Sequence, residues 1–367
     1  MDDHFYIDHP SFLEKPWNLP SKCKNENPLK GEAMGMTDVI CKRLLDRPFT
    51  ITEYNYSGPG RFRGVGGIVT GAAGALQDWD GLWRFAWAHN IDLIRKPGSQ
   101  PMGYFNMADD PLSLAAERAS ICLFLRRDLP VLDKTCEIQL PADQLRKIDP
   151  KQTMSKMSGK WLGWYFKTGT KVVEVFEKSG RDLDFETAYR GKTAELEKKL
   201  FLKGKRPHVA GNGHVAIKPE DGTFVLKTDR TCGGFAEKGG VKAGPFAAVT
   251  DTPATVWASS LDGKVLEQSA HILVTHLTDL QNSDIRYRDP ERTVLEAWGH
   301  LPYLMRKGKA DVSLKAAPGK WTVKRLDATG RVMGRVPSTY ADGELRFSAR
   351  TDHDPSNATY LYELERP

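Results

Sequence analysis

The residues best suited to chemistry lie at the end of a short apolar segment. Phe49 to Tyr54 is rich in β-forming residues, and it places Glu53 just before Asn55 and the loop Gly58-Pro59-Gly60. A carboxylate at the carboxyl end of a parallel barrel strand faces the active site. Apolar walls and a few polar neighbours would hold Glu53 oriented for nucleophilic attack. A glutamate at a strand end is also common on an ordinary protein surface. The residues around Glu53 must therefore distinguish a catalytic carboxylate from a surface one.

Three tryptophans follow within nine residues, in the segment QDWDGLWRFAW. Aromatic faces stack on the apolar faces of sugar rings, while carboxylates and histidines bond to hydroxyl groups. Packing in the core is the alternative interpretation for Trp79, and it extends to Trp83. Trp87 is the better platform because it lies at the expected strand end. Trp83 and Trp87 are therefore both kept as candidates for substrate binding.

The N-terminal segment DDHFYIDHP is dense in titratable and aromatic groups, within residues 1–30 that are predicted to form a long loop. A metal site formed by His4, Asp8 and His9 is one interpretation. It is disfavoured because polar loops that line sugar sites have the same composition, and no metal or other cofactor is expected. His4, Tyr6 and His9 are then candidates for contacts with a substrate, together with Asn55.

The elements that must position these residues follow from pattern. Residues 49–54, 64–77 and 82–88 predict a strand, a helix and a second strand, which is a βαβ arrangement. Asp110-Pro111 begins a further helix that reaches Leu125. Past residue 210, short β-prone runs alternate with turn residues, which is typical of one or two antiparallel β-sandwich domains.

The same residues carry a resemblance to a known family. ITEYN, followed after a helix by QDWDGLWRFAW, resembles strands seven and eight of a clan A glycoside hydrolase barrel, with similarity to β-galactosidase-like and cellulase- or mannanase-like members. The resemblance implies that Glu53 is the nucleophile of a retaining enzyme that cleaves β-glycosidic bonds of oligo- or polysaccharides. It implies that Trp87 lines the subsite next to the cleaved bond. DDHFYIDHP resembles the loop after strand six, whose His and Tyr residues approach the nucleophile, and both His4 and Tyr6 fit that role.

The chain departs from this family in its length. A (β/α)₈ barrel takes about 250 residues, whereas only about 90 residues precede the end of the second strand here. A retaining hydrolase needs a second carboxyl group about 5 Å from the nucleophile. Asn25-Glu26 has the right dipeptide but lies in a loop upstream of the strand-seven match, so it is rejected. The chain is therefore expected to be the C-terminal portion of a longer enzyme, whose missing N-terminal barrel portion supplies the acid/base.

The predicted fold is an α/β partial barrel, comprising the last two or three β/α units, followed by mainly antiparallel β-sandwich domains. Residues 1–130 are assigned to the barrel, 131–210 to a basic mixed linker, 211–290 to a β-sandwich segment and 291–367 to a C-terminal β-domain. The last two segments resemble the accessory β-domains that follow such barrels. The alternative function is a non-catalytic carbohydrate-binding β-domain protein with a vestigial barrel fragment.

Composition excludes several classes of protein. The 367 residues include 53 Lys and Arg against 47 Asp and Glu, and a net charge of +6 is too small and too mixed to indicate a nucleic-acid binder. The longest apolar runs are too short to span a bilayer, so no membrane partner is expected. The N-terminal residues do not form a secretory signal, and the five cysteines form no close metal-ligand pair. The cellular location stays open.

One region carries the excess charge. Residues 141–210 hold 16 Lys and Arg against 9 Asp and Glu, so the remainder of the chain is close to neutral. A solvated, partly helical surface is the simple interpretation. A contact surface for an anionic polymer is the sharper one.

Overall fold

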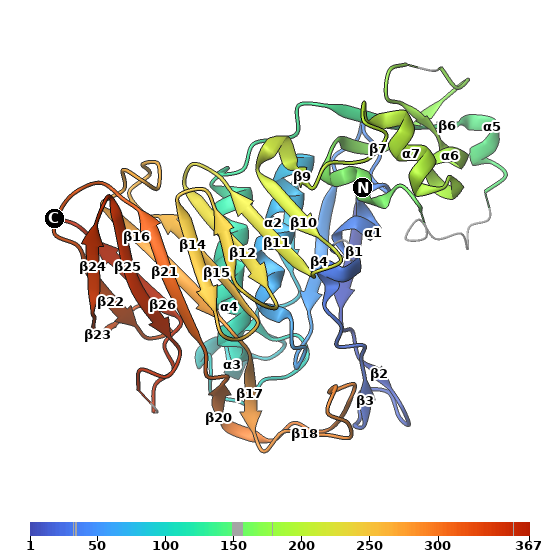
Figure 1. Ribbon diagram of the computed structural model, residues 1–367. Helices are drawn as coiled ribbons and strands as arrows, with labels where there is room; N and C mark the ends of the chain where they lie inside the picture. Colours follow the sequence, from blue (N-terminus) through green and yellow to red (C-terminus); the bar gives the residue numbers. More distant parts are fainter. Residues whose placement is uncertain (32, 34, 149–156, 178, 355) are drawn as a thin grey trace.

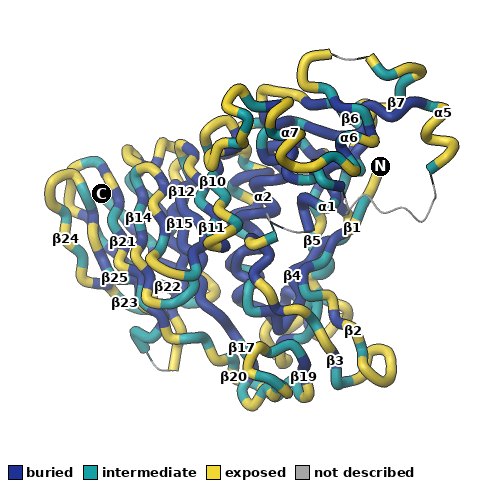
Figure 2. Tube along the Cα trace, turned by 45° about the vertical axis from the view of Figure 1, so that its right-hand side comes forward, coloured by how far each residue is buried: buried dark blue, intermediate teal, exposed yellow. Residues whose placement is uncertain are grey.

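The computed structural model describes residues 1–31, 33, 35–148, 157–177, 179–354 and 356–367. Helices and strands are mixed, and antiparallel sheets dominate the second half of the chain. The elements are arranged in layers, with a five-stranded sheet, a nine-stranded sheet, the helices α2 (Gly66–Gln77) and α4 (Pro111–Ser120), and a small parallel sheet following one another (Figure 1). Buried residues run through the whole stack (Figure 2).

The parallel sheet contains β1 (Asp2–Ile7), β4 (Thr50–Tyr56) and β5 (Gly81–Arg84), in the order β1-β4-β5. The predicted succession of strand, helix and strand between residues 49 and 88 is confirmed, with α2 between the two strands. The predicted loop at the N-terminus is wrong for β1. Phe5 and Ile7 alternate as buried residues along it, and burying them requires a strand paired with β4.

Helix α2 carries several glycines because it lies very close to α4. A Cβ atom on Gly67 would lie 1.8 Å from the carbonyl oxygen of Ala116, and one on Gly71 would lie 2.5 Å from the Cα atom of Ser120. Glycine is the residue that allows this backbone approach. The predicted helix from residue 110 is also confirmed, and it continues past Ser120 as a π-turn over Ile121–Leu125.

The second half of the chain forms two stacked antiparallel sheets. The nine-stranded sheet contains β9 (Val209–Ala210), β10 (Val215–Lys218), β11 (Thr223–Lys227), β12 (Thr231–Ala236), β15 (Ala254–Ser260), β16 (His271–Leu277), β22 (Thr322–Leu326), β23 (Val332–Val336) and β26 (Leu361–Glu365). The five-stranded sheet contains β13 (Val241–Ala243), β14 (Phe246–Thr250), β21 (Lys309–Lys315), β24 (Ser338–Ala341) and β25 (Glu344–Arg350).

The boundary expected at residue 290 does not separate two sheets. β16 pairs with β26, and β14 pairs with β21, so both sheets take strands from either side of that position. Every residue of β15 is buried, because one face of the sheet packs against the five-stranded sheet and the other lies against the helical layer.

A protruding segment joins the sandwich to the loop that follows β1. β17 (Leu280–Ser283) pairs with β20 (His300–Met305). Between them, β18 (Arg286–Tyr287) and β19 (Val294–Ala297) form a small sheet with β3 (Ser21–Lys22) and β2 (Ser11–Phe12), seen at the bottom of Figure 1. The loop after β1 is therefore held by a segment 272 residues downstream, since Val294 is paired with Lys22.

The segment expected as a linker contains a folded unit. Its strands β6 (Thr135–Pro141), β7 (Lys167–Val173) and β8 (Leu183–Asp184) are parallel, and its helices are α5 (Ala142–Leu145), α6 (Phe185–Arg190) and α7 (Thr193–Leu200). Elsewhere in the described residues, α1 (Met36–Ile40) and α3 (Ile91–Arg95) are further short α-helices. The amide of Gln77 at the end of α2 donates to the carbonyls of Gly163 and Phe166, at 2.7 Å each, which ties the unit to the helical layer. Residues 149–156 of the predicted linker lie outside the described part of the chain.

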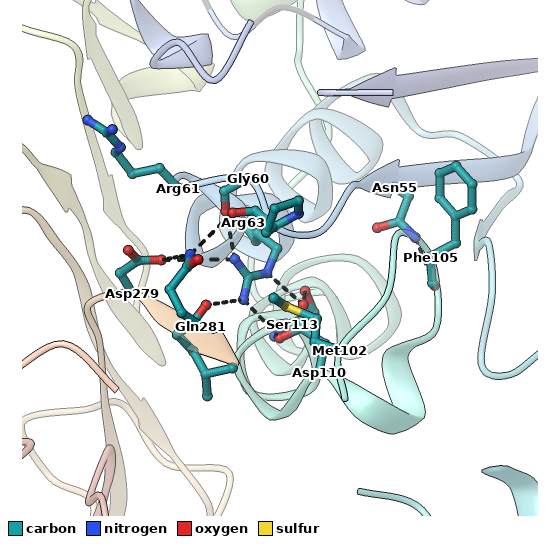
Figure 3. A network of polar contacts seen from close by, with 12 residues as sticks. Asn55, Gly60, Arg61, Arg63, Met102, Phe105, Asp110, Ser113, Asp279 and Gln281 are labelled. Carbon is teal, nitrogen blue, oxygen red and sulfur yellow. Dashed lines mark hydrogen bonds and ion pairs between the residues drawn. The ribbon is translucent and has the colours of Figure 1, made fainter. Parts of the chain in front are cut away.

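A fully buried arginine connects three parts of the fold (Figure 3). The guanidinium of Arg63 donates to Asp110 at 2.6 Å, to the Gly60 carbonyl at 2.7 Å and to the Leu280 carbonyl at 2.8 Å. Asp110 is the N-cap of α4, where its carboxylate accepts from the backbone N–H of Ser113. Burial alone would raise the pKa of Asp110, but the charge and hydrogen bonds of Arg63 lower it overall, so the pair is ionised.

Within the described residues, none of the helices has the length and apolar character that a membrane crossing requires.

His276 should make the stability of the protein depend on pH. Its fully buried ring lies on the sandwich side of β16, and burial lowers its pKa to about 4 against the opposing charge of Asp251. The unfolded chain, with a histidine pKa of about 6.5, therefore binds a proton that the folded chain excludes. Stability is full above about pH 6.5 and falls toward pH 4, by about 3 kcal/mol.

Urea unfolding near neutral pH and near the pKa of the folded state measures this effect. The His276→Gln variant should lose most of the extra slope, because glutamine cannot take up the proton. His208→Gln, at an exposed position, serves as the control and should keep it. Equal slopes for His276→Gln and the wild-type chain would assign the pH dependence to other groups.

Candidate functional site

The register of the parallel sheet brings the N-terminal segment to Glu53. His4 is paired with Glu53 and Tyr6 with Asn55, across β1 and β4. Ile51, Tyr54 and Tyr56 of β4 are buried in the core that contains α2, while Thr52 is exposed and Glu53 is half-buried. The sheet therefore has one face toward the helices and one face that presents polar side chains.

Glu53 is held by two neighbours from β1. The hydroxyl of Tyr6 donates to its Oε2 at 2.6 Å, and Nδ1 of His4 lies 3.5 Å from the same oxygen. The side chain of Glu53 is 34% exposed, so the carboxylate remains open to a ligand. Burial, together with the hydrogen bond and charge of Glu53, raises the pKa of Tyr6, so this phenol remains a donor through the neutral range.

His4 is fixed from its other side. Its Nε2 lies 3.1 Å from Oδ2 of Asp2 and 3.1 Å from the hydroxyl of Thr52. The pKa of Asp2 is lowered, mainly by its hydrogen bond from the Thr52 side chain. The His4 ring therefore lies between the Asp2 carboxylate on its Nε2 side and the Glu53 carboxylate on its Nδ1 side.

Aromatic rings from separate loops surround Tyr6. The Tyr6 ring lies 5.1 Å from that of His9, 6.4 Å from that of Phe85 and 5.6 Å from that of Phe105. Phe105, in the loop before α4, thus completes a cluster that begins in β1 and β5. The sequence signal for Phe105 is weak. It consists of two adjacent aromatic residues between polar and flexible ones in Gly103–Asn106, and the long separation from Glu53 in the sequence gives no reason to connect the two.

The three tryptophans differ in how exposed their side chains are. Trp79 is buried in the core against Phe49, which confirms the core interpretation for this residue. Trp83 and Trp87 are 54% and 48% exposed, so both rings are accessible for stacking. Their predicted contact with a substrate stays a prediction.

Asn55 is engaged by protein partners on both ends of its amide. It is buried, and its Nδ2 donates to the carbonyl of Phe105 (Figure 3) and to that of Phe85. Its Oδ1 accepts from Arg84 at 3.0 Å. Arg84 in turn forms an ion pair with Glu117 of α4 at 2.8 Å. In this arrangement Asn55 holds the loop that carries Phe105 against the end of β4. Its predicted role in substrate binding is untested.

His4, Asp8 and His9, the residues of the disfavoured metal interpretation, each have a different partner. His9 Nδ1 lies 3.1 Å from the Pro10 carbonyl, and Asp8 accepts from the backbone N–H of Asn25 at 2.7 Å. His4 faces Asp2 and Glu53. Burial raises the pKa of Asp8 to about 6. A cavity of about 500 Å³ adjoins Tyr6, Asp8 and His9, on the side of β1 away from β4.

Comparison with family models, with curated proteins and with solved structures finds no match to this chain. The arrangement of the site itself indicates which chemistry is possible. A carboxylate with a phenol donor on one oxygen, on an open polar face, can attack an electrophilic carbon or accept a proton. The aromatic surroundings favour a substrate with apolar ring faces.

Proposed function

We propose that this chain carries the nucleophile of a retaining glycoside hydrolase that acts on β-linked oligo- or polysaccharides. β1, β4 and β5 would be three consecutive strands of a (β/α)₈ barrel, with Glu53 on its inner face. The observation that carries the proposal is the Tyr6 hydrogen bond to Glu53. It holds one carboxylate oxygen and leaves the other for attack. Glu53 lies within β4, three residues before the carboxyl end of the strand, which is the end where barrel enzymes place their catalytic groups.

The reaction follows in two displacements. A Glu53 oxygen forms a bond to the anomeric carbon while the bond from that carbon to the leaving oxygen breaks. The leaving oxygen keeps the electron pair of the broken bond and receives a proton from the acid/base carboxyl group. Water then gives a proton to the same group and attacks the anomeric carbon, which releases Glu53. Two inversions retain the β configuration. Trp87 and Trp83 would stack against the sugar rings on either side of the cleaved bond.

The proposal requires a second carboxyl group about 5 Å from Glu53. The neighbours of Glu53 described above are His4, Tyr6 and Thr52, of which none is a carboxylic acid. In this proposal the acid/base belongs to a further part of the barrel, since none of these three neighbours can serve. The experiment below is chosen so that this group is not needed.

Covalent capture tests the assignment of Glu53 directly. The chain is incubated with dinitrophenyl β-glycosides of glucose, galactose and mannose that are fluorinated at the second carbon. Dinitrophenolate leaves without a proton, and fluorine slows hydrolysis of the ester that forms, so the acid/base group is dispensable. Intact mass should rise by one fluorosugar per chain for at least one of these reagents, and peptide mapping should place it on Glu53.

A matched carboxylate controls for nonspecific reaction. Glu186 on α6 is exposed and far from β4 in the chain, so its peptide should remain unlabelled in the same digest. Label on several surface carboxylates would indicate chemical modification without a site. The absence of label on Glu53 with every reagent at saturation would remove its role as nucleophile.

Tyr6→Phe should slow capture by about 10- to 100-fold, because a hydrogen bond to a charged group contributes about 1.5–3 kcal/mol. The variant removes only the hydroxyl that fixes the Glu53 oxygen. Tyr340→Phe, which removes a hydroxyl bonded to the Ala316 carbonyl in the sandwich, is the control and should react at the wild-type rate. Dinitrophenolate release measures both rates. A shift of the pH profile in Tyr6→Phe alone would identify Tyr6 as a positioning residue, whereas an unchanged rate would contradict this role.

The alternative is a non-catalytic protein that binds carbohydrate through its β-domains. The large aromatic residues Trp257, Trp321 and Tyr362 of the sandwich are buried, so they offer no platform for a sugar ring. Titration of the whole chain with neutral oligosaccharides tests this alternative. Binding that persists while Glu53 remains unlabelled would favour it.

A further inference from the structure

A hollow of about 440 Å³ lies between the end of α7 and the turn that follows β9. Its lining is described throughout and comprises Lys134, Tyr165, Phe166, Arg181, Leu200, Phe201, Leu202, Lys203, Lys205, Pro207, Val209, Ala210, Gly211, Asn212 and Gly213. The unit that contains it lies at the end of the molecule where β1 begins, whereas β2 and β3 lie at the other end (Figures 1 and 2). The hollow is thus remote from the carboxyl end of the parallel sheet.

All charged side chains in this lining are cations. They are Lys134, Arg181, Lys203 and Lys205, and each is exposed. Among the described residues, none of the four forms an ion pair with a carboxylate. Neighbouring cations behave differently, since Arg206 is paired with Glu197 at 3.0 Å and Lys167 with Asp78 at 2.9 Å.

Four unpaired cations around one hollow repel each other and raise the local potential. An anion placed among them relieves that repulsion and gains charge-assisted hydrogen bonds. Arg181 offers a planar fork that matches a carboxylate or sulfate, and the lysines offer point charges that reach several positions. The hollow therefore selects ligands by negative charge.

The walls of the hollow add an apolar surface. Leu202 is fully exposed and Val209 is 49% exposed, although both are apolar. Behind them, the ring of Phe201 packs on those of Tyr165 and Phe166, at 5.3 and 5.7 Å. A ligand that bears anionic groups on a ring with apolar faces would cover this surface and contact the cations at once.

We propose that this hollow binds an acidic oligosaccharide, one that carries carboxylate or sulfate groups, and anchors it away from Glu53. The carbohydrate class of the ligand rests on the proposed function, while the selection for anions rests on the cations themselves. The local excess of positive charge in residues 141–210 is the sequence counterpart of this site.

A nucleic acid fits these observations less well. Single strands are bound along extended basic grooves with exposed aromatic platforms for successive bases. Here the cations converge on one hollow, and the exposed apolar residues are the aliphatic Leu202 and Val209.

Calorimetric titration of the full chain tests the proposal with four probes. These are an oligogalacturonate, a sulfated galacto-oligosaccharide, a neutral galacto-oligosaccharide of the same length and a single-stranded oligonucleotide of matched charge. At least one acidic oligosaccharide should bind 10-fold or more tightly than the neutral one, and salt should weaken that binding. Comparison of the first two probes identifies carboxylate or sulfate as the recognised group.

Two double variants with equal loss of charge locate the site. Lys203→Gln with Lys205→Gln should weaken binding of the acidic probe by 10-fold or more. Lys192→Gln with Lys218→Gln removes two exposed cations outside the lining and should change binding less than 3-fold. Circular dichroism confirms that both variants are folded.

Three results would overturn the proposal. These are equal binding of neutral and acidic oligosaccharides, equal effects of the two double variants, and tighter binding of the oligonucleotide than of either acidic sugar. The Glu53→Gln variant should bind the acidic probe as the wild-type chain does. Capture on Glu53 without acidic-sugar binding would contradict only this inference, and binding without capture would contradict only the role of Glu53.

Discussion

Glu53→Gln is expected to lower the rate of covalent capture by a factor on the order of 10⁴ or more, as removal of other enzymatic nucleophiles does. Glutamine has nearly the shape of glutamate and can still accept the hydrogen bond from Tyr6. Its amide oxygen, however, lacks the negative charge that attacks the anomeric carbon. The change therefore removes the nucleophile while it leaves the surroundings in place.

Release of dinitrophenolate and intact mass measure this loss independently. The Glu186→Gln variant, which changes an exposed carboxylate on α6, should be captured at the wild-type rate. Addition of azide to the wild-type chain should also speed turnover of unfluorinated dinitrophenyl glycosides and give a glycosyl azide of β configuration, because azide attacks the sugar ester on Glu53. Retained capture in Glu53→Gln would show that another group reacts.

Arg63→Met is expected to destabilise the protein by about 3–5 kcal/mol, the usual cost of a buried charge that loses its partner. Methionine fills much of the same volume but leaves the carboxylate of Asp110 buried at the start of α4 without its cation. The carbonyls of Gly60 and Leu280 also lose their donor. Chemical unfolding near neutral pH gives the change in free energy.

A second substitution separates charge from packing. In Arg63→Met with Asp110→Asn, the neutral amide removes the uncompensated charge, so part of the lost stability should return. Arg127→Met breaks an ion pair with Asp78 whose side chains are 56% and 40% exposed, and it should cost about 0–1 kcal/mol. An effect of Arg63→Met no larger than that of Arg127→Met would mean that Arg63 does not hold these segments together.

Local patterns predicted the elements whose cause is local. The strand that contains Glu53, helix α2 and the many short antiparallel strands past residue 210 follow from residue type and spacing. The predicted position of Glu53 at the end of its strand is wrong, because pairing with β1 extends β4 to Tyr56. β1 was missed because its alternation is short and its segment is rich in polar residues. Its strand conformation depends on hydrogen bonds to β4, nearly 50 residues away.

The contacts of the candidate site depend on the tertiary structure. Tyr6 reaches Glu53 across 47 positions of sequence, and neither residue's local pattern specifies the parallel register that joins them. From the sequence, both His4 and Tyr6 were candidates for the neighbour of Glu53. The register pairs His4 with Glu53, and Tyr6 reaches the same carboxylate through its hydroxyl. Phe105 joins the same cluster through a loop that Asn55 holds.

The sequence by itself determined which carboxylate belongs to a β-forming segment, where tryptophans concentrate and where positive charge accumulates. Only the tertiary structure decided that Arg63 bridges Gly60, Asp110 and Leu280, and that Lys134 and Arg181 meet the lysines after α7. The physical reason is that propensity and periodicity act between neighbours in the chain. Convergence of distant side chains is set by the burial and hydrogen bonding of the whole chain at once.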